Sequence, residues 1–348
     1  MLPPTFEDIV AARKFIAKYL PKTPLVRLPK ISEALECDYY AKLENLQPTG
    51  AFKVRGGVNL VGNEVNTSRV SGSDDQATSA NGGVTLITAS TGNHGQSIAY
   101  AGRLFGARVI IYAPAENVNE SKMQAMRDLG AEVRHHGRDF DEARLEIERL
   151  APEKGYRYVH SANEPALIAG VGTIGLEIFE DLPDVDVIIA PAGGGSCAAG
   201  NCIVAGELNP KVRVFATQSE AAPVLWHAFR NRSLNPYPTM ATVHEGLATR
   251  VPFELTNKIL WELLTDFILV SDEEINQAIR ILALDAKQVA EGAGAASLAA
   301  AIRLSSVRSP TVREGNVVSE DLRGKKVVGI LTGGNIPAER LAKLMRSV

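Results

Sequence analysis

Cysteine is scarce in this sequence, and its spacing excludes several kinds of site. The 348 residues include only three cysteines, Cys37, Cys197 and Cys202, and no Cys-x-x-Cys pair. Three cysteines make no even disulfide framework, so we expect a reducing compartment and therefore the cytoplasm. His135 and His136 are adjacent and would diverge on a strand, while Cys197 and Cys202 would not share a helix face. We therefore expect loop histidines, small buried cysteines and no metal.

An excess of charge of either sign is also absent. The 37 basic and 40 acidic residues give a net charge of -3, which offers no basic footprint for nucleic acid or an anionic membrane. The N-terminus lacks a basic start followed by an apolar run, so we expect no signal peptide. The longest apolar stretch, 185–206, is interrupted by Gly193, Gly194 and Gly195. A buried strand, a turn and a helix explain it better than a membrane span.

The order of the expected elements indicates the fold class. Thr5 and Asp8 form a capping pattern for a first helix that ends by Pro21. Short β-rich runs then alternate with helical periodicity, which favours parallel sheets covered by helices. Strands are expected at 39–43, 84–89, 109–112, 185–190, 212–216 and 327–331. Two polar segments, 66–83 and 305–323, are expected to be exposed loops or insertions. The chain is longer than a typical single domain, so we expect an α/β protein of two domains.

Loops that follow parallel strands form ligand sites in such proteins, and two of these loops carry reactive or polar side chains. In 49–57, Lys53 lies in an apolar turn flanked by glycines, where desolvation would free an amine able to form a Schiff base. The alternative is an ordinary exposed lysine. In Ser90-Thr91-Gly92-Asn93-His94, hydroxyls and N–H groups at a helix start would hold a carboxylate. The alternatives are a plain helix cap and a histidine that bonds a neighbouring backbone group.

Two further loops are rich in glycine. Gly193-Gly194-Gly195-Ser196 lies between a buried strand and a helix and could wrap a phosphate. The same loop, with Ala198 and Glu220 downstream, also fits a nicotinamide dinucleotide fingerprint, and the loop alone does not separate the two. Thr332, followed by Gly333 and Gly334, ends the last strand, and its hydroxyl could meet a ring nitrogen or simply lie in a turn.

These four segments, in this order, resemble those of the fold type II pyridoxal-phosphate family, in the branch of threonine dehydratase, serine dehydratase and serine racemase. The resemblance covers nearly the whole chain and includes the segments 163–173, 245–248 and 291–295. It implies two α/β domains, each with a mainly parallel twisted sheet flanked by helices. The smaller would span 45–157, the larger 1–44 and 158–348, with no regulatory domain. It also implies a homo-oligomer, either a dimer or a tetramer.

The resemblance assigns roles to residues of the four loops. It implies that Lys53 carries pyridoxal 5'-phosphate, with Phe52 against the cofactor ring, Asn93 at the ring hydroxyl, Gly193, Gly194, Gly195 and Ser196 around the phosphate, Thr332 at the pyridine nitrogen, and Ser90, Thr91, Gly92, Asn93 and His94 around the substrate carboxylate. The implied reaction is removal of water and ammonia from L-threonine, L-serine or a related β-hydroxy amino acid, giving a 2-oxo acid.

Two departures from the family pattern bear on the activity. Racemase members have serine at the position of Thr91, where it serves as the acid and base on the face opposite the lysine, so the resemblance makes Thr91 a candidate catalytic residue beside Lys53. Dehydratases commonly have a small apolar residue there, so a serine or aspartate racemase is the nearest alternative. A nicotinamide-dependent oxidoreductase is the alternative from another class.

Racemase-like members also bind a divalent cation where this chain has Gln218, Ala222 and Val224, which are poor ligands for a hard cation. We therefore expect no divalent metal site at that position.

Overall fold

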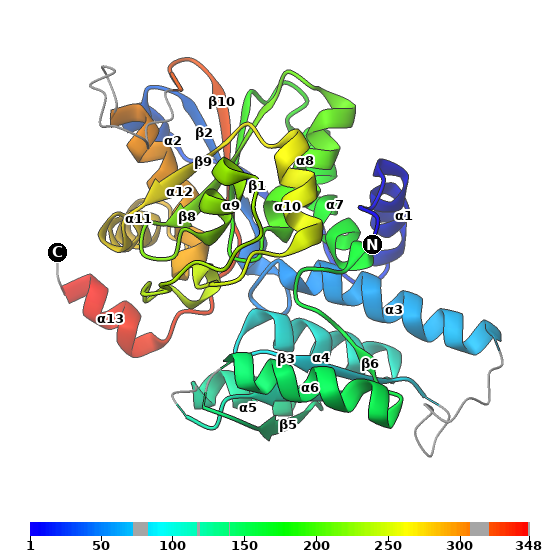
Figure 1. Cartoon of the computed structure of the whole chain (residues 1–348). Helices are drawn as coiled ribbons and strands as arrows, with labels where there is room; N and C mark the ends of the chain where they lie inside the picture. The colour runs from blue at the N-terminus through cyan, green and yellow to red at the C-terminus, as the bar shows by residue number, and fades with distance from the viewer. Residues whose placement is uncertain (72–82, 117–118, 139, 307–319, 347–348) are drawn as a thin grey trace.

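The computed structural model describes residues 1–71, 83–116, 119–138, 140–306 and 320–346, and it contains two separate sheets (Figure 1). The six-stranded sheet has the order β1-β2-β10-β7-β8-β9, and the four-stranded sheet has the order β5-β4-β3-β6. Only β1 and β2 pair antiparallel; the other pairs of strands in the described residues are parallel. The strands are β1 (Leu25–Arg27), β2 (Asp38–Leu43), β3 (Thr85–Ala89), β4 (Arg108–Ala113), β5 (Glu132–His135), β6 (Arg157–Tyr158), β7 (Val187–Pro191), β8 (Arg213–Ser219), β9 (Asp266–Val270) and β10 (Lys326–Leu331). The expected α/β architecture with mainly parallel sheets is confirmed.

Helices flank both sheets. They are α1 (Phe6–Ile16), α2 (Pro29–Leu35), α3 (Lys53–Ser71), α4 (Asn93–Phe105), α5 (Glu120–Asp128), α6 (Phe140–Lys154), α7 (Pro165–Asp181), α8 (Ser196–Leu208), α9 (Val224–Asn231), α10 (Glu254–Leu263), α11 (Asp272–Asp285), α12 (Gly292–Ser306) and α13 (Ala338–Arg346), with 3-10 turns η1 (Glu44–Leu46) and η2 (Glu245–Leu247). We call the part built on the six-stranded sheet the larger lobe and the part built on the four-stranded sheet the smaller lobe. Helix α3 runs between them (Figure 1). Thr5 and Asp8 form the expected capping box at the start of α1.

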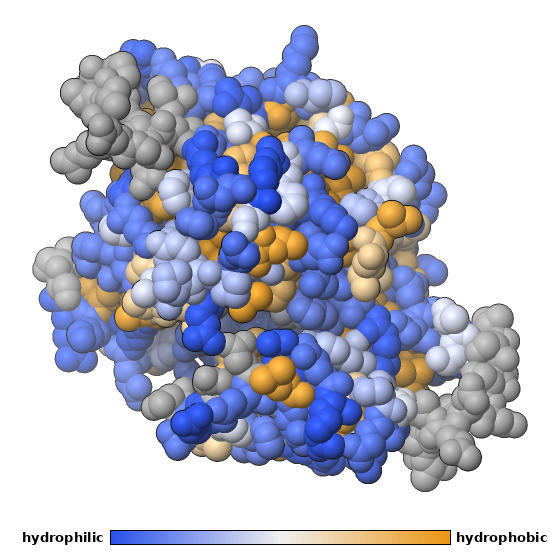
Figure 2. Space-filling view, viewed as in Figure 1, coloured by the Kyte–Doolittle hydropathy of each residue, from blue (hydrophilic) through white to orange (hydrophobic). Residues whose placement is uncertain are grey.

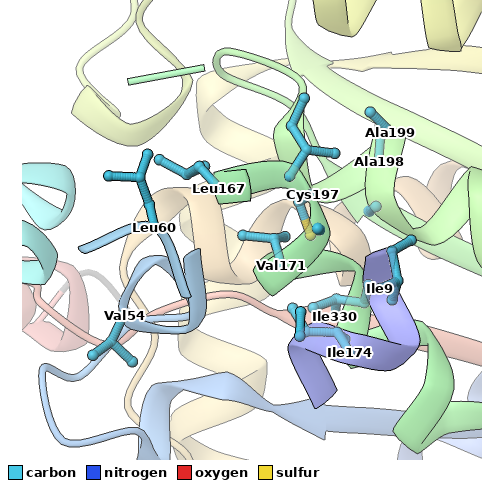
Figure 3. Packing of buried hydrophobic residues seen from close by; sticks show 14 of the residues in the cluster. Ile9, Val54, Leu60, Leu167, Val171, Ile174, Cys197, Ala198, Ala199 and Ile330 are labelled. Atoms are coloured by element: carbon cyan, nitrogen blue, oxygen red, sulfur yellow. The ribbon is translucent and has the colours of Figure 1, made fainter. Parts of the chain in front are cut away.

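The largest hydrophobic core lies where α1, α3, α7 and α8 pack beside the six-stranded sheet, and it continues through α4 to β3 and β4 of the smaller lobe. Figure 3 shows side chains from these helices and from β10 meeting in it: Ile9, Val54, Leu60, Leu167, Val171, Ile174, Cys197, Ala198, Ala199 and Ile330. The helices approach closely at glycines, because a Cβ on Gly170 would lie 2.5 Å from the backbone oxygen of Arg55. Gly172 and Gly200 make the same kind of close crossing between α7 and α8. The glycines of 168–173 therefore serve helix packing.

A buried cluster of charges ties the start of α3 to the larger lobe. The Arg55 guanidinium donates to both carboxylate oxygens of Glu44 and to both of Glu177, at 2.7–2.8 Å. The Lys42 ammonium donates to Glu177 and to the backbone oxygen of Thr23, each at 2.7 Å. All four charged side chains are fully buried. Burial opposes the charge on Glu177, but the hydrogen bonds from Arg55 and Lys42 outweigh it and lower the pKa of Glu177 to about 2.

The structure corrects several expectations about individual segments. The six expected strands correspond to β2, β3, β4, β7, β8 and β10, whereas β1, β5, β6 and β9 were not expected. Residues 66–71 are helical, as the end of α3, so the expected loop at 66–83 is wrong there, and 72–82 lie outside the described residues. The exposed loop expected at 305–323 is wrong at Ser305 and Ser306, which end α12, and at Glu320 and Leu322, which are buried. Residues 307–319 of that segment lie outside the described residues. His135 is the last residue of a strand, not a loop histidine.

The surface in Figure 2 is mainly hydrophilic, with hydrophobic residues exposed in small groups, and it is hollowed between the two lobes. Among the described residues, none of the helices combines the length and apolar character that crossing a membrane requires. All four strands of the smaller lobe begin at or before residue 157, but β6 continues to Tyr158. The limits of the two domains at 45 and 157 stay a prediction.

Candidate active site

The loop that leads into α3 and the loop that follows β10 are held together by backbone hydrogen bonds. Ala51 and Gly333 form an antiparallel bridge, and the N–H of Phe52 donates to the oxygen of Thr332 at 2.9 Å. Gly50 has a φ of +68°, a conformation that suits glycine, and its oxygen accepts from the N–H of Gly334. Two segments about 280 residues apart in sequence thus form one side of a site.

Lys53 is the first residue of α3, and its amine is directed to this site. Its Nζ donates to the backbone oxygen of Ser161 at 3.3 Å and to Ser196 Oγ at 3.4 Å, and it lies 5.3 Å from the centre of the Phe52 ring. No carboxylate pairs with it among the described residues. Burial therefore lowers the pKa of Lys53 to about 8. An amine with this pKa is partly neutral near pH 8, as a nucleophile must be.

The triple-glycine loop joins β7 to α8 and forms a cradle of backbone. A Cβ on Gly193 would lie 2.3 Å from the oxygen of Gly246, so only glycine fits there. Gly195 has a φ of +88° and stands at the N-cap of α8 without a side-chain hydrogen bond to the first turn. The N–H groups at the start of α8 are therefore available to an anion, and the helix dipole favours one. Ser196 adds a buried hydroxyl at the same end.

Thr332 follows β10 and is buried, with 2% of its surface exposed. Its Oγ1 has no hydrogen-bond partner among the described residues. A buried hydroxyl without a partner is costly, and a ligand with a polar atom at this place would satisfy it. This orphaned hydroxyl, the glycine cradle and the amine of low pKa fit a group with an aldehyde, a phosphate and a ring nitrogen.

The loop before α4 is partly a helix cap, which was the simpler interpretation of its sequence. Ser90 Oγ accepts from the N–H groups of Gly92 at 3.2 Å and Gly95 at 2.8 Å, so this hydroxyl is a helix cap. The backbone N–H groups of Thr91, Asn93 and His94 donate to no acceptor among the described residues. A Cβ on Gly92 would meet nothing within 4 Å. The loop thus offers open space and free backbone donors to an anion, while Ser90 shapes the loop.

His94 is buried and neutral. Thr88 donates its hydroxyl proton to the oxygen of Val159 at 2.8 Å, so the Thr88 oxygen accepts from His94 Nε2 at 2.9 Å. Nδ1 of His94 is then unprotonated, and it has no partner among the described residues. Burial, reinforced by the charge on Lys53, lowers the pKa of His94 to about 3. His94 thus has a structural hydrogen bond, but to the Thr88 side chain and not to the neighbouring backbone group that the alternative expected.

Asn93 is the first residue of α4 and contacts the larger lobe. Its Nδ2 donates to Glu291 Oε1 at 2.6 Å, and its Oδ1 accepts from Asn335 Nδ2 at 2.8 Å. Glu291 precedes α12, and burial raises the pKa of its carboxyl, although the Lys122 charge and the bond from Asn93 oppose this. Glu291 and Asn335 lie in segments that carry the resemblance, but no pattern in the sequence gave either a role.

His160 and Ser161 are site residues that sequence reasoning missed. His160 Nδ1 accepts from the N–H groups of Ala162 and Asn163 at 3.0 Å, which folds the turn that presents the Ser161 oxygen to Lys53. Burial lowers the pKa of His160 to about 4. A backbone oxygen leaves no trace in a sequence, and one histidine before a helix is not distinctive.

The residues of the alternative sites are used elsewhere. Glu220, the candidate ribose ligand, forms an ion pair with Arg303. Gln218 Oε1 accepts from the N–H groups of Leu225 and Trp226, so it caps α9 instead of facing a cation. Within the described ranges, no three His, Cys, Asp or Glu side chains gather as metal ligands would. The three cysteines are buried free thiols, as expected.

Comparisons with known proteins agree with this geometry. A family model described as "Pyridoxal-phosphate dependent enzyme" matches residues 16–320. An L-threonine ammonia-lyase of Thermotoga maritima is 34% identical over 98% of this chain and 78% of its own. Maize serine racemase superposes with a TM-score of 0.84 at 27% identity, covering 99% of this chain and 97% of that chain. The processed form of a threonine deaminase from Solanum lycopersicum gives a TM-score of 0.84 at 25% identity, covering 99% and 95%. This chain therefore belongs to the family of pyridoxal-phosphate dependent enzymes.

Proposed function

We propose that this protein is an ammonia-lyase that removes water and ammonia from L-threonine, L-serine or a related β-hydroxy amino acid. One observation carries the proposal: the Lys53 amine donates a hydrogen bond to Ser196 at the glycine cradle, and the bridge between Ala51 and Gly333 brings Thr332 to the same site. Relatives named L-threonine ammonia-lyase and L-threonine dehydratase support the substrate class.

The cofactor would be held at three places. The Lys53 amine would bind the aldehyde carbon, since its low pKa makes it nucleophilic. Gly193, Gly194, Gly195 and Ser196 would hold the phosphate at the start of α8. The unpaired hydroxyl of Thr332 would form a hydrogen bond with the ring nitrogen. Phe52, which lies beside Lys53, would contact the ring.

The loop before α4 would bind the substrate. The free N–H groups of Thr91, Asn93 and His94 suit a carboxylate at a helix start, and the open space at Gly92 admits it. The Asn93 amide would reach the ring hydroxyl. Ser90 caps the helix, so its contribution is to hold this loop in shape.

The bound cofactor supplies an electron sink for the charge left when a proton leaves the substrate α-carbon. Once the substrate amine has replaced it on the aldehyde carbon, the free Lys53 amine would take that proton, because its pKa of about 8 leaves part of it unprotonated near that pH. His94 is neutral near neutral pH, because burial lowers its pKa to about 3, so it does not serve as a cationic acid there. Loss of the β-hydroxyl as water, followed by hydrolysis, gives the 2-oxo acid and ammonia.

Racemisation is the second candidate, and Thr91 is the observation that favours it. Thr91 carries a hydroxyl beside the open space at Gly92, where a second acid and base could act on the substrate. Solved structures named serine racemase and aspartate racemase share the fold with this chain.

The two candidates differ in their products. Purified protein supplied with L-threonine or L-serine is expected to release 2-oxobutanoate or pyruvate together with ammonia, and Thr91→Ala should keep this activity. Thr91→Ser is expected to raise D-serine formation at least tenfold over Thr91→Ala, since proton transfer by a placed side chain contributes roughly 10²–10⁴-fold. D-serine without any 2-oxo acid would replace the lyase proposal with the racemase.

We also propose the cytoplasm as the place of action and a dimer or tetramer as the working form. The three reduced, buried cysteines support a reducing compartment. Light scattering of the purified protein tests the assembly: one chain of 37.3 kDa as the only species would contradict it.

A further inference from the structure

Three side chains from both lobes form one hydrogen-bonded cluster at the site. Asn93 comes from the first turn of α4 in the smaller lobe. Glu291 precedes α12 and Asn335 follows β10, and both of these elements belong to the larger lobe (Figure 1). Asn93 is bonded to both of the others, at 2.6 and 2.8 Å. Its amide therefore lies between two polar groups that are built on the other lobe.

The Asn335 amide can lie in only one orientation. Its Nδ2 donates to the backbone oxygen of Thr49 at 2.9 Å and to Asn93 Oδ1 at 2.8 Å, which uses both of its hydrogens. Exchanging the nitrogen and oxygen of Asn335 would place an oxygen against the oxygen of Thr49. The Thr49 oxygen cannot donate, so it fixes Asn335.

Asn335 and Glu291 in turn fix the Asn93 amide. Its oxygen must face the donor Nδ2 of Asn335, and its nitrogen must face the acceptor oxygen of Glu291. A reversed Asn93 amide would meet nitrogen with nitrogen on one side and oxygen with a carboxyl oxygen on the other. The Glu291 backbone is held as well, because its N–H donates to the oxygen of Gly333 at 3.0 Å.

One hydrogen of Asn93 Nδ2 remains for a ligand. The amide nitrogen has two hydrogens, and Glu291 Oε1 is its single acceptor among the described residues. We propose that Glu291 and Asn335 are positioning residues that hold the Asn93 amide so that it offers an N–H, and not its carbonyl, to the ring oxygen of the cofactor. This inference rests on the proposed function and adds two residues that control how the cofactor is bound.

The ring oxygen gives the proposal a spectroscopic consequence. An N–H donor stabilises negative charge on a phenolic oxygen, whereas a carbonyl oxygen would repel it. Reversal of the Asn93 amide should therefore move the visible band of the bound cofactor to shorter wavelength. It should also weaken cofactor binding about tenfold to a hundredfold, the range expected for a lost hydrogen bond to a charged group.

The first test compares Asn335→Asp with Asn45→Asp. Asn335→Asp places carboxylate oxygens against the oxygens of Thr49 and Asn93, so we expect the shorter-wavelength band and at least tenfold weaker binding of pyridoxal 5'-phosphate. Asn45 is the matched control, because its Nδ2 also donates twice, to Gln288 and to the Val289 oxygen, without contact to Asn93. Asn45→Asp should keep the wild-type band and bind within about threefold. Equal effects of the two variants on band and affinity would overturn the proposal.

The second test keeps the proposal open to refutation even where Asn335→Asp fails to fold. Glu291→Gln retains a carbonyl acceptor for Asn93, and Glu291→Leu does not. We expect the wild-type band and affinity within about threefold for Glu291→Gln, and the shifted band with at least tenfold weaker binding for Glu291→Leu. Identical bands and affinities in the two variants would contradict the proposed positioning.

These outcomes are separable from failure of the proposed function. If wild-type protein takes up no pyridoxal 5'-phosphate and shows no visible band, the proposed function itself is wrong. If the wild type shows the band and the paired variants do not differ, the proposed function stands and the positioning role of Glu291 and Asn335 is wrong.

Discussion

Three basic side chains at the site have lost most of their contact with water, and their proton states follow from that. Burial lowers the pKa of Lys53 to about 8, of His94 to about 3 and of His160 to about 4. The two histidines are neutral at physiological pH, with Nε2 of His94 protonated. The site therefore holds one amine able to exchange a proton near neutral pH, and two imidazoles that only shape loops.

The neutral state of His94 predicts a pH dependence of stability. Between pH 3 and the usual histidine pKa near 6.5, the unfolded chain binds a proton that the folded chain refuses. The stabilisation from neutral His94 is thus present above pH 6.5 and is lost as pH falls toward 3. His94→Gln should flatten the slope of unfolding free energy against pH between 4 and 6.5 by up to one proton, about 1.4 kcal/mol per pH unit. Urea titrations across this range measure it, and an unchanged slope would refute the assignment.

At the scale of single residues, the sequence predicted positions better than interactions. Lys53, Thr332 and the triple glycine were expected at the site because each follows a strand, and the structure places them together. The phosphate loop alone did not separate pyridoxal phosphate from a nicotinamide nucleotide, and the family match decides it. A helix cap was one of two interpretations of the loop that contains Ser90, and the sequence alone did not decide between a cap and a carboxylate ligand.

Helix α3, which begins with Lys53, is held to the larger lobe both by close helix packing and by buried charges. Helix α3 contacts α7 through the glycine crossing at Gly56 and Gly170, and it is bound to the larger lobe through Arg55. Arg55 lies two residues after Lys53, so the ion cluster fixes the turn that aims the amine. Removing one partner from such a cluster leaves buried charge without compensation.

Replacing Arg55 by methionine should therefore be severely destabilising. Glu44 and Glu177 would remain buried with only Lys42 and the more distant Arg13 as neighbouring cations, at an expected cost of about 3–5 kcal/mol in unfolding free energy. The surface control is Arg149→Met on α6, which removes two exposed ion pairs and should leave the midpoint of urea unfolding nearly unchanged. Equal shifts of the two midpoints would contradict the role of the buried cluster.

Elements were predictable where hydrophobic periodicity was strong. The six expected strands are in the two sheets because each is an apolar run bounded by turn residues. The short β6 and the edge strands β1 and β5 were missed, since short or half-exposed strands give little periodic signal. Strand β9 was missed although it is a buried apolar run as long as β3 and β7. The helical end of α3 at 66–71 was missed because its Asn, Thr and Ser residues suggested a loop.

At the scale of the whole molecule, the site lies where the two lobes meet. Asn93 of the smaller lobe bonds Glu291 and Asn335 of the larger lobe, and Lys122 of α5 forms an ion pair with Glu245 of η2. Both contacts are between residues far apart in sequence. Such contacts depend on how the lobes pack, so a single sequence did not reveal them, whereas the resemblance to known enzymes supplied the overall plan.

We propose that loops from both lobes form one cofactor site with the Lys53 amine as its covalent anchor. The most direct test is borohydride reduction of protein incubated with pyridoxal 5'-phosphate, followed by digestion and mass spectrometry. We predict a reduced cofactor adduct on the peptide that contains Lys53, loss of the visible band, and neither band nor adduct in Lys53→Ala. An unmodified Lys53 peptide, or an adduct on another lysine that persists in Lys53→Ala, would contradict the account.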